Sequence, residues 1–425
     1  MEFSRLKNLF VVLIMIEALT AGISFFLQDI NAFAPYQADT LSNSQRNVLT
    51  EINNTQTNDK KIQELLPPQL PLLPQKLSNP PGVIKAVYVT GYSAGTKSYL
   101  NYLTNLFKTT EINAVAVDIK GSDGRVDAIA DINSLVRFFH DKNIYVIGRI
   151  AVFEDPLYSK ARPDLAVYNK LKTTDKENPV LWQDNNRLFW LDPASKEVWD
   201  YNISLAKDAL SHGFDEINFD YIRFPSDGDM ENLGFPVWDQ KIPKSEIIKE
   251  FFQYLRQQLA GEKISADLFG QTTVNTDDMG IGQILEDAFE SFDYLSPMVY
   301  PSHYISGFIG FENPAEHPYQ VVEYSMQSAL NRQKFYLQSE KIKNSEVQGS
   351  PAAESQQILN SDLTIKPSSK FRPWLQDFDI GADYTADMVK QEIKAVKDAL
   401  GNDFDGFMLW NPYNIYTTGA ISKTK

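Results

Sequence analysis

The hydrophobic pattern of this 425-residue chain becomes regular from about residue 83 onward. Short apolar runs there alternate with amphipathic stretches such as "INSLVRFFHDKN" and "TADMVKQEIKAVKDALG". The apolar runs predict eight strands, at 86–91, 114–120, 144–152, 216–224, 264–269, 294–300, 371–378 and 406–411. Strands that alternate with helices are typical of βα units and a parallel sheet.

Eight βα units between residues 83 and 425 predict one (β/α)8 barrel, a TIM barrel in the α/β class. An open doubly wound sheet is the alternative, but no GxGxxG motif follows the first strand. A polar, Ser-rich segment at 340–369 interrupts the alternation after the sixth strand. We expect it to be an insertion in the barrel domain.

Within the predicted strands, apolar and polar residues occupy alternate positions. The fourth strand shows this most clearly, with Ile217, Phe219 and Tyr221 against Glu216, Asn218 and Asp220. Successive side chains of a strand point to opposite faces, so one set should contact the helices and the other should fill the barrel. At least five strands place polar residues on the inner face near their C-terminal ends, where barrel enzymes carry their active sites.

Two inward carboxylates on neighbouring strands, Asp220 and Asp267, suit glycoside hydrolysis. One attacks or stabilises the sugar centre and the other protonates the leaving oxygen, at a separation of about 5–5.5 Å in retaining enzymes. Glu154, Asp155 and Asp377 stay open as alternatives to Asp267 as the acid. In the same stretch as Asp220, we expect Asp215 to be solvated and Glu216 to be structural.

Other inward or rim residues are candidates for binding a sugar. Aromatic rings stack on sugar faces, and charged or amide groups hold hydroxyls or orient carboxylates. The predicted substrate-binding residues are Tyr88, Thr90, Asp118, Lys120, Arg149, Arg223, Tyr300, His303, Trp374, Gln376 and Trp410. Two alternatives stay open, namely that Asp118 and Arg149 form a buried ion pair and that Tyr88 and Trp374 are core residues.

Charge and composition exclude several function classes. The formal net charge of −15 disfavours nucleic-acid binding, which needs a basic face. The absence of Cys excludes thiol catalysis, and four His residues make a His-rich metal centre improbable. The stretch "DIKGSDGRVD" lacks both the spacing and the closing Glu of a calcium loop. We therefore predict neither a metal nor a cofactor.

The N-terminal segment, residues 1–27, predicts export. Arg5 and Lys7 precede nineteen mostly apolar residues at 9–27, which nearly span a bilayer core of about 30 Å at about 1.5 Å per residue. The positive flank favours a signal anchor with the remainder outside the cytoplasm. Glu17 lies within the run, so a cleaved signal peptide and a secreted protein stay open. Residues 28–82, rich in Pro, Asn and Gln, should form a linker.

From residue 83 to residue 416, several long motifs resemble the putative glycosyl hydrolase domain family, a TIM-barrel family long listed as a domain of unknown function. The motifs include "AVYVTGYSAG", "INAVAVDIKGSDGRV", "IYVIGRIAVFEDP", "GFDEINFDYIRFPSDG", "PMVYPSHY" and "GFMLWNPYN". The barrel is also distantly similar to the alpha-amylase and alpha-galactosidase groups, which carry a nucleophilic Asp at the end of the fourth strand. That resemblance implies that Asp220 is the nucleophile.

These observations together predict a glycoside hydrolase. We expect it to act by a retaining two-carboxylate mechanism on an extracellular or cell-envelope polysaccharide, with the N-terminal segment in the membrane. Two alternatives stay open: a non-catalytic carbohydrate-binding barrel, and a scaffold protein of the cell envelope.

Overall fold

The computed structural model describes residues 73–126, 129–347 and 369–422. The predicted signal segment at 1–27 and most of the predicted linker lie outside these residues. Within the described part of the chain, no helix is both long and apolar enough to cross a membrane.

Eight parallel strand positions close into a barrel. The strands are β1 (Ile84–Val89), β2 (Ala114–Lys120), β3 (Tyr145–Ala151), β5 (Glu216–Asp220), β7 (Ile264–Phe269), β8 (Tyr294–Met298), β9 (Lys370–Phe371) with β10 (Trp374–Gln376), and β11 (Gly406–Trp410). They pair in this order, and β11 pairs with β1 to complete the ring. The eight strands predicted from the alternating pattern are therefore confirmed.

Most strand ends lie within two residues of the prediction, and two strands differ more. The fourth barrel strand, β5, ends at Asp220 rather than at Phe224, because Tyr221 has a left-handed φ of 53° that ends the extended conformation. The seventh is split into β9 and β10 around Arg372 and Pro373. Pro373 has no N–H to donate, although its carbonyl accepts from the Met408 N–H at 2.9 Å.

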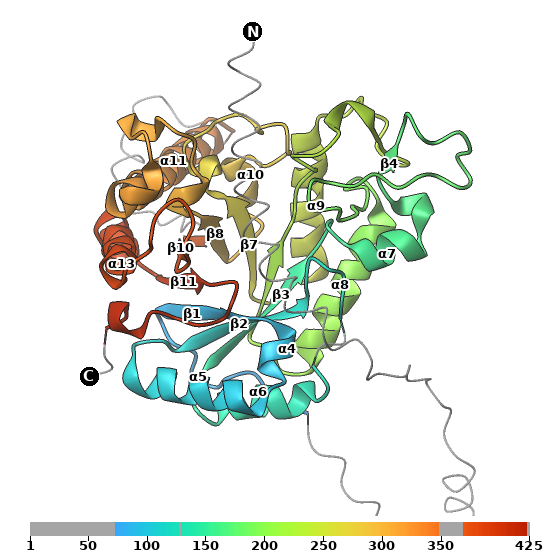
Figure 1. Ribbon diagram of the computed structural model, residues 1–425. Coiled ribbons are helices and arrows are strands. Elements are labelled where there is room, and N and C mark those ends of the chain that lie inside the picture. Colours follow the sequence, from blue (N-terminus) through green and yellow to red (C-terminus); the bar gives the residue numbers. More distant parts are fainter. Residues whose placement is uncertain (1–72, 127–128, 348–368, 423–425) are drawn as a thin grey trace, which may run out of the picture.

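Helices cover the outside of the ring (Figure 1). The helices are α4 (Gly91–Ala94), α5 (Lys97–Thr109), α6 (Ile132–His140), α7 (Pro156–Ala161), α8 (Lys196–Ser211), α9 (Lys244–Gln258), α10 (Leu285–Ala288), α11 (Pro318–Val347) and α13 (Ala386–Leu400). The pair α11 and α13 packs on the opposite side of the barrel from α8 and α9. A short antiparallel pair, β4 (Tyr168–Asn169) and β6 (Leu233–Gly234), lies in the loops.

The alternation of side chains divides the core into two clusters. The outer cluster joins the strands to the helices and includes Val115, Ile217 and Phe219. The inner cluster fills the barrel and includes Ala116, Tyr88 and Met408. Each cluster takes the strand face that the two-residue period assigns to it.

The last residues of the predicted linker pack against the floor of the barrel. Pro74 is buried, and Leu77 packs against the inner cluster. The Leu77 N–H donates to Asp215 Oδ1 at 2.6 Å, and Asp215 Oδ2 accepts from the Val146 N–H at 2.7 Å and lies 2.9 Å from His140 Nε2. The expectation of a solvated Asp215 is wrong, because this carboxylate ties the entering chain to the floor.

Helix α11 continues through residues 340–347, the first part of the predicted insertion. The remainder of that segment up to residue 368 lies outside the described residues.

Candidate active site

One guanidinium organises the C-terminal end of the barrel. Arg149, on β3, donates from Nη1 to Asp118 Oδ1 at 2.6 Å and from Nη2 to Asp220 Oδ2 at 2.5 Å. Its Nε lies 3.8 Å from Asp267 Oδ2. Three carboxylates from β2, β5 and β7 therefore surround a single cation. The Asp118–Arg149 ion pair that the sequence left open is present, but as part of this larger cluster.

Asp220 and Asp267 lie level with each other on adjacent strands. The β5–β7 register pairs Asn218 with Ser265 and Phe219 with Ala266, so Asp220 and Asp267 are next in line. Both carboxyl groups contact Arg149, so one guanidinium lies between them. This arrangement allows both carboxyl groups to face one sugar ring.

Burial favours the neutral form of the Asp267 carboxyl. Its side chain is 1% exposed, and this burial raises the pKa of Asp267 well above its usual range. The neighbouring charge of Asp220 raises it further, and Arg149 opposes the shift. Oδ1 accepts from Asn218 Nδ2 at 2.8 Å and from Trp374 Nε1 at 2.7 Å, whereas Oδ2 is buried and accepts no hydrogen bond. The proton of the neutral form therefore belongs on Oδ2.

Asp220 has the opposite environment. Its Oδ2 accepts from Arg149, and its Oδ1 accepts from the backbone N–H of Tyr221 at 2.6 Å. Hydrogen bonds from a cation and an amide stabilise a carboxylate anion. The left-handed φ of Tyr221 accompanies this contact, and nothing in the sequence signalled it. The two carboxyl groups thus lie in different environments, since Asp220 contacts Arg149 directly and Asp267 accepts from two neutral N–H donors.

Aromatic rings line the space around Arg149. Tyr88 and Trp410 stack with ring centroids 3.9 Å apart, and Trp374 meets both rings edge-on at 6.5 and 5.7 Å. The Arg149 guanidinium lies 5.0 Å from the Trp410 ring. Tyr300 is buried in the same inner cluster. Tyr88 also donates from its hydroxyl to Asp118 Oδ2 at 2.6 Å, so its ring position is fixed.

Two predicted residues lie at the rim. His303 follows β8 and is exposed, with its ring centroid 5.2 Å from that of Tyr300. Arg223 follows β5 and packs its guanidinium against the Trp190 and Phe269 rings, 4.7 and 4.6 Å from their centroids. Arg223 is buried and donates to the Phe224 carbonyl and to Ser226 Oγ, so of these two residues only His303 is exposed at the rim.

Three predicted binding residues make hydrogen bonds within the protein. A bulge between Asp118 and Lys120 shifts the β2–β3 register, and Lys120 turns outward to Asp155 Oδ2 at 2.8 Å, fully buried. The strict alternation assumed for this strand is therefore wrong at Lys120. Thr90 caps α4 by accepting from the Ser93 N–H, and Gln376 bonds to the backbone of the loops at 302, 378 and 380.

The alternative acids differ in their availability. Asp155 pairs with Lys120 and caps α7, and Asp377 accepts from the N–H and hydroxyl of Thr417. Both have structural roles. Glu154 is also buried but has no hydrogen bond or ion pair among the described residues. It remains a candidate beside Asp267.

A second charged layer lies deeper in the barrel. Glu216 and Arg372 form an ion pair in which both side chains are fully buried. Ser265 donates to Glu216 Oε1 at 2.6 Å, and Tyr145 to Oε2 at 3.3 Å. This layer closes the barrel below the candidate site, in agreement with a structural Glu216.

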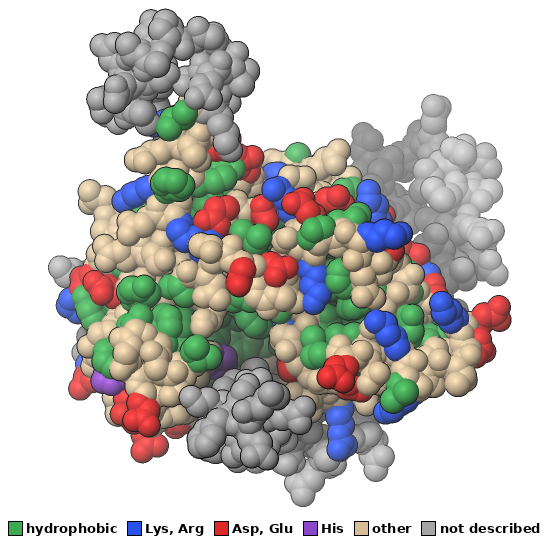
Figure 2. Space-filling view, turned by 90° about the horizontal axis from the view of Figure 1, so that it is seen from above, with side chains coloured by type: hydrophobic (Ala, Val, Ile, Leu, Met, Phe, Trp, Pro, Cys, Tyr) green, Lys and Arg blue, Asp and Glu red, His purple; other side chains and the backbone are tan. Residues whose placement is uncertain are grey.

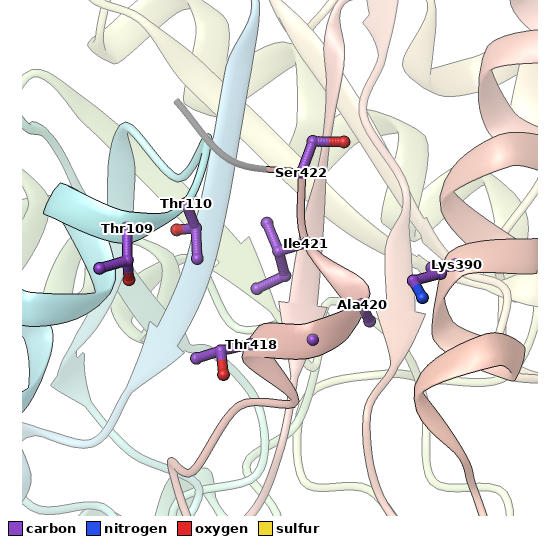
Figure 3. Close-up of a pocket in the computed structure, with 8 residues that line it drawn as sticks. Thr109, Thr110, Lys390, Thr418, Ala420, Ile421 and Ser422 are labelled. Atoms are coloured by element: carbon purple, nitrogen blue, oxygen red, sulfur yellow. The ribbon is translucent and has the colours of Figure 1, made fainter. Parts of the chain in front are cut away.

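The described residues contain no group of three or more His, Cys, Asp or Glu side chains that could hold a metal ion. A cavity of about 460 Å³ lies outside the barrel between the end of α5 and α13 (Figure 3). Its lining contains Lys390 but no carboxylate. On the face shown in Figure 2, acidic and basic side chains are interspersed.

Sequence comparison adds a family to this geometry. The model of a family described as "Putative glycosyl hydrolase domain" matches residues 86–343 and 348–416. The chain belongs to this family. The match spans the barrel and includes every residue of the candidate site, and the membership supports a glycoside hydrolase. No curated protein matches the chain.

Three solved structures are similar to the chain. A hypothetical protein from Ruminiclostridium thermocellum ATCC 27405 is 38% identical, with a TM-score of 0.38, over 46% of this chain and 98% of that one. The PgaB (BpsB) glycoside hydrolase domain from Bordetella bronchiseptica is 13% identical, with a TM-score of 0.49, over 80% and 99%. The alpha-galactosidase TtGalA from Thermus thermophilus, in complex with stachyose, is 17% identical, with a TM-score of 0.38, over 61% and 53%.

Proposed function

We propose that this protein is a glycoside hydrolase that cleaves an O-glycosidic bond with retention, with Asp220 as the nucleophile. The observation that carries the proposal is the level placement of Asp220 and Asp267 around Arg149. A retaining enzyme needs an ionised carboxylate at the sugar centre and a neutral carboxyl close to it. Asp220 has the environment of the first, and Asp267 that of the second.

The aromatic lining supports a sugar as the ligand. Tyr88, Trp374 and Trp410 lie beside the carboxylate cluster, since the Arg149 guanidinium is 5.4 and 5.0 Å from the Tyr88 and Trp410 rings and Trp374 donates to Asp267. Aromatic side chains with a few fixed polar groups are typical of ligand pockets in barrel enzymes. Arg149 would hold Asp220 in place while Asp118 and Tyr88 fix Arg149. Asp267, the acid expected from the sequence, is the second catalytic carboxyl in this proposal.

We also propose that the barrel acts outside the cytoplasm on a cell-envelope or extracellular polysaccharide. The apolar run at 9–27 behind Arg5 and Lys7 supports export through a signal anchor or a signal peptide. Protease treatment of intact cells that express the full chain tests this location. Resistance of the barrel in intact cells and digestion only after lysis would contradict it.

The test of the activity is a screen of the full chain against a library of polysaccharides and oligosaccharides, with release of reducing ends as the readout. We expect turnover by the wild type and none by Asp220→Asn. The matched control is Asp208→Asn, which changes an exposed carboxylate on α8 and should keep full activity. Turnover that survives Asp220→Asn would contradict the assigned nucleophile.

The stacked pair Tyr88 and Trp410 also suits a second candidate function, a non-catalytic carbohydrate-binding barrel. The same screen separates the two functions. Saturable binding of a glycan without any turnover, equal in the wild type and in Asp220→Asn, would favour the binding function.

A further inference from the structure

Glu154 lies at the C-terminal end of the barrel, where the chain that follows β3 runs beside the end of β5. The main chain after β3 continues to pair with β5, since the Val152 N–H donates to the Asp220 carbonyl at 2.8 Å and the Phe153 N–H to the Tyr221 carbonyl at 3.3 Å. Glu154 is the next residue. The backbone thus brings its side chain to the strand end that carries Asp220.

The Glu154 side chain is buried and has no bonding partner. It is only 4% exposed, and among the described residues it forms neither a hydrogen bond nor an ion pair. The other acids near this strand end are all engaged, as Asp155 is with Lys120 and Asp184 is with Trp190 Nε1 at 3.0 Å. A buried carboxyl without a partner is costly and is typical of functional sites.

The surroundings of Glu154 favour the neutral form of its carboxyl. Burial is the largest effect and raises the pKa of Glu154 well above its usual range, and the charge of Asp184 raises it further. The opposing cation is Arg223, which makes no ion pair within 4.0 Å among the described residues. The charged groups that act on Glu154 are Asp184, Arg223, Asp220 and Asp227.

Asp267 and Glu154 both act electrostatically on or with Asp220, and they differ in what their oxygen atoms can reach. In Asp267, Oδ1 is occupied by two N–H donors, and Oδ2 is buried against Arg149. In Glu154, both oxygens lack a partner at the mouth, where the leaving group of a polysaccharide would lie. A general acid must come within hydrogen-bond reach of the oxygen that it protonates.

We propose that Glu154 is a further catalytic residue and that Glu154, in place of Asp267, protonates the leaving-group oxygen. This inference rests on the proposed function with Asp220 as the nucleophile. Asp267 then contacts the reacting sugar as a neutral hydrogen-bond donor, and its proton stays on Oδ2. Arg223 lies beside Glu154, where it can hold hydroxyl groups of the departing sugar.

Asp220, Glu154 and one water molecule are sufficient for both steps of the reaction. Asp220 attacks the anomeric carbon, the bond from that carbon to the glycosidic oxygen breaks, and the Glu154 proton moves to that oxygen. A glycosyl ester of Asp220 and an ionised Glu154 result. Glu154 next takes a proton from water as the water oxygen attacks the anomeric carbon, which frees Asp220 and restores the neutral Glu154.

The test compares Glu154→Ala and Glu154→Gln with Asp267→Asn in the full chain. The probes are 2,4-dinitrophenyl and methyl glycosides of the sugars on which the wild type acts. A methyl glycoside needs protonation to depart and a dinitrophenyl glycoside does not. Both Glu154 variants should lose about 10³-fold of kcat/KM on methyl glycosides, within the usual range for a general acid, and less than about tenfold on dinitrophenyl glycosides. Added azide should accelerate Glu154→Ala and give a glycosyl azide of retained configuration.

Asp267→Asn is the matched control, because it should lower kcat/KM on both probes by the same factor and should not respond to azide. Two results would overturn the role of Glu154 while leaving the proposed function intact: equal losses on both probes in the Glu154 variants, or leaving-group dependence in Asp267→Asn. Failure of the wild type on every glycoside would instead overturn the proposed function, and this inference with it.

Discussion

The two charged layers inside the barrel differ in their balance of charge. In the floor layer, the Glu216 carboxylate pairs with the Arg372 guanidinium. Two hydroxyl groups also donate hydrogen bonds to this carboxylate. In the mouth layer, the single guanidinium of Arg149 meets three carboxylates. Each charge in the floor layer therefore has a partner of opposite sign, whereas the mouth layer has more carboxylates than guanidinium groups.

This difference separates structure from chemistry. A balanced, buried ion pair holds its geometry and gives a substrate nothing to bind, because its hydrogen bonds are already made. Burial, and after it the charges of neighbouring carboxylates, raise the pKa of Asp267 and of Glu154. The barrel thus combines a floor whose charges are paired with a mouth in which three carboxylates share the Arg149 guanidinium.

The largest expected effect is at Asp220. Asp220→Asn removes the nucleophile and should lower kcat by about 10⁴-fold or more, whereas the fold should survive because the amide keeps the shape of the side chain. Initial rates on the best substrate from the screen, with thermal unfolding of the same samples, measure both quantities. If Asp220→Asn kept a kcat close to that of the wild type, the mouth layer would not be the catalytic one.

Breaking the floor pair should have the opposite signature. Glu216→Gln leaves Arg372 buried without its counter-charge, which should lower the free energy of unfolding by about 3–5 kcal/mol and change kcat by less than a few-fold. Urea unfolding gives the stability. The double variant Glu216→Gln with Arg372→Met removes both charges and should recover most of the loss. A strong loss of kcat in samples that are still folded would show that the floor layer takes part in catalysis.

The pH dependence of stability distinguishes Asp267 from an ordinary buried pair. Its pKa is raised in the folded state above an unfolded value of about 3.9, so the folded state holds the proton longer. The stability contributed by the neutral form is present below pH 4 and is lost as the pH rises through the folded pKa. Asp267→Asn cannot ionise, and its melting temperature should therefore fall less than that of the wild type between pH 5 and pH 8. If the melting temperatures of the two proteins fell in parallel with pH, Asp267 would already be ionised at pH 5.

The smallest effect concerns the chain that enters at the floor. Leu77→Ala removes a half-buried side chain from the inner cluster and should cost about 1–2 kcal/mol without changing kcat. Leu73→Ala, at an exposed position, should leave the urea midpoint unchanged. Equal midpoints for the two variants would show that this segment does not support the floor.

Alternation along the strands was enough to predict the eight-strand barrel and the inward direction of Arg149, Asp220 and Asp267, because side-chain direction has a period of two. It failed at Lys120, where a bulge reverses the direction, and at Asp215, whose partners come from the linker and from β3. These features depend on contacts between distant segments. The sequence likewise could not show that the Glu154 carboxyl lacks a hydrogen-bond partner, because this depends on which distant segments surround it.

The most direct test of the central claim is the identity of the residue that bonds to the sugar. The full chain is incubated with a 2-deoxy-2-fluoroglycosyl fluoride of the preferred sugar, and the intact protein and its peptides are measured by mass spectrometry. We expect one added glycosyl group, on the peptide that contains Asp220, and none in Asp220→Asn. Turnover without an adduct and with inverted product configuration, or an adduct on another residue, would contradict the account.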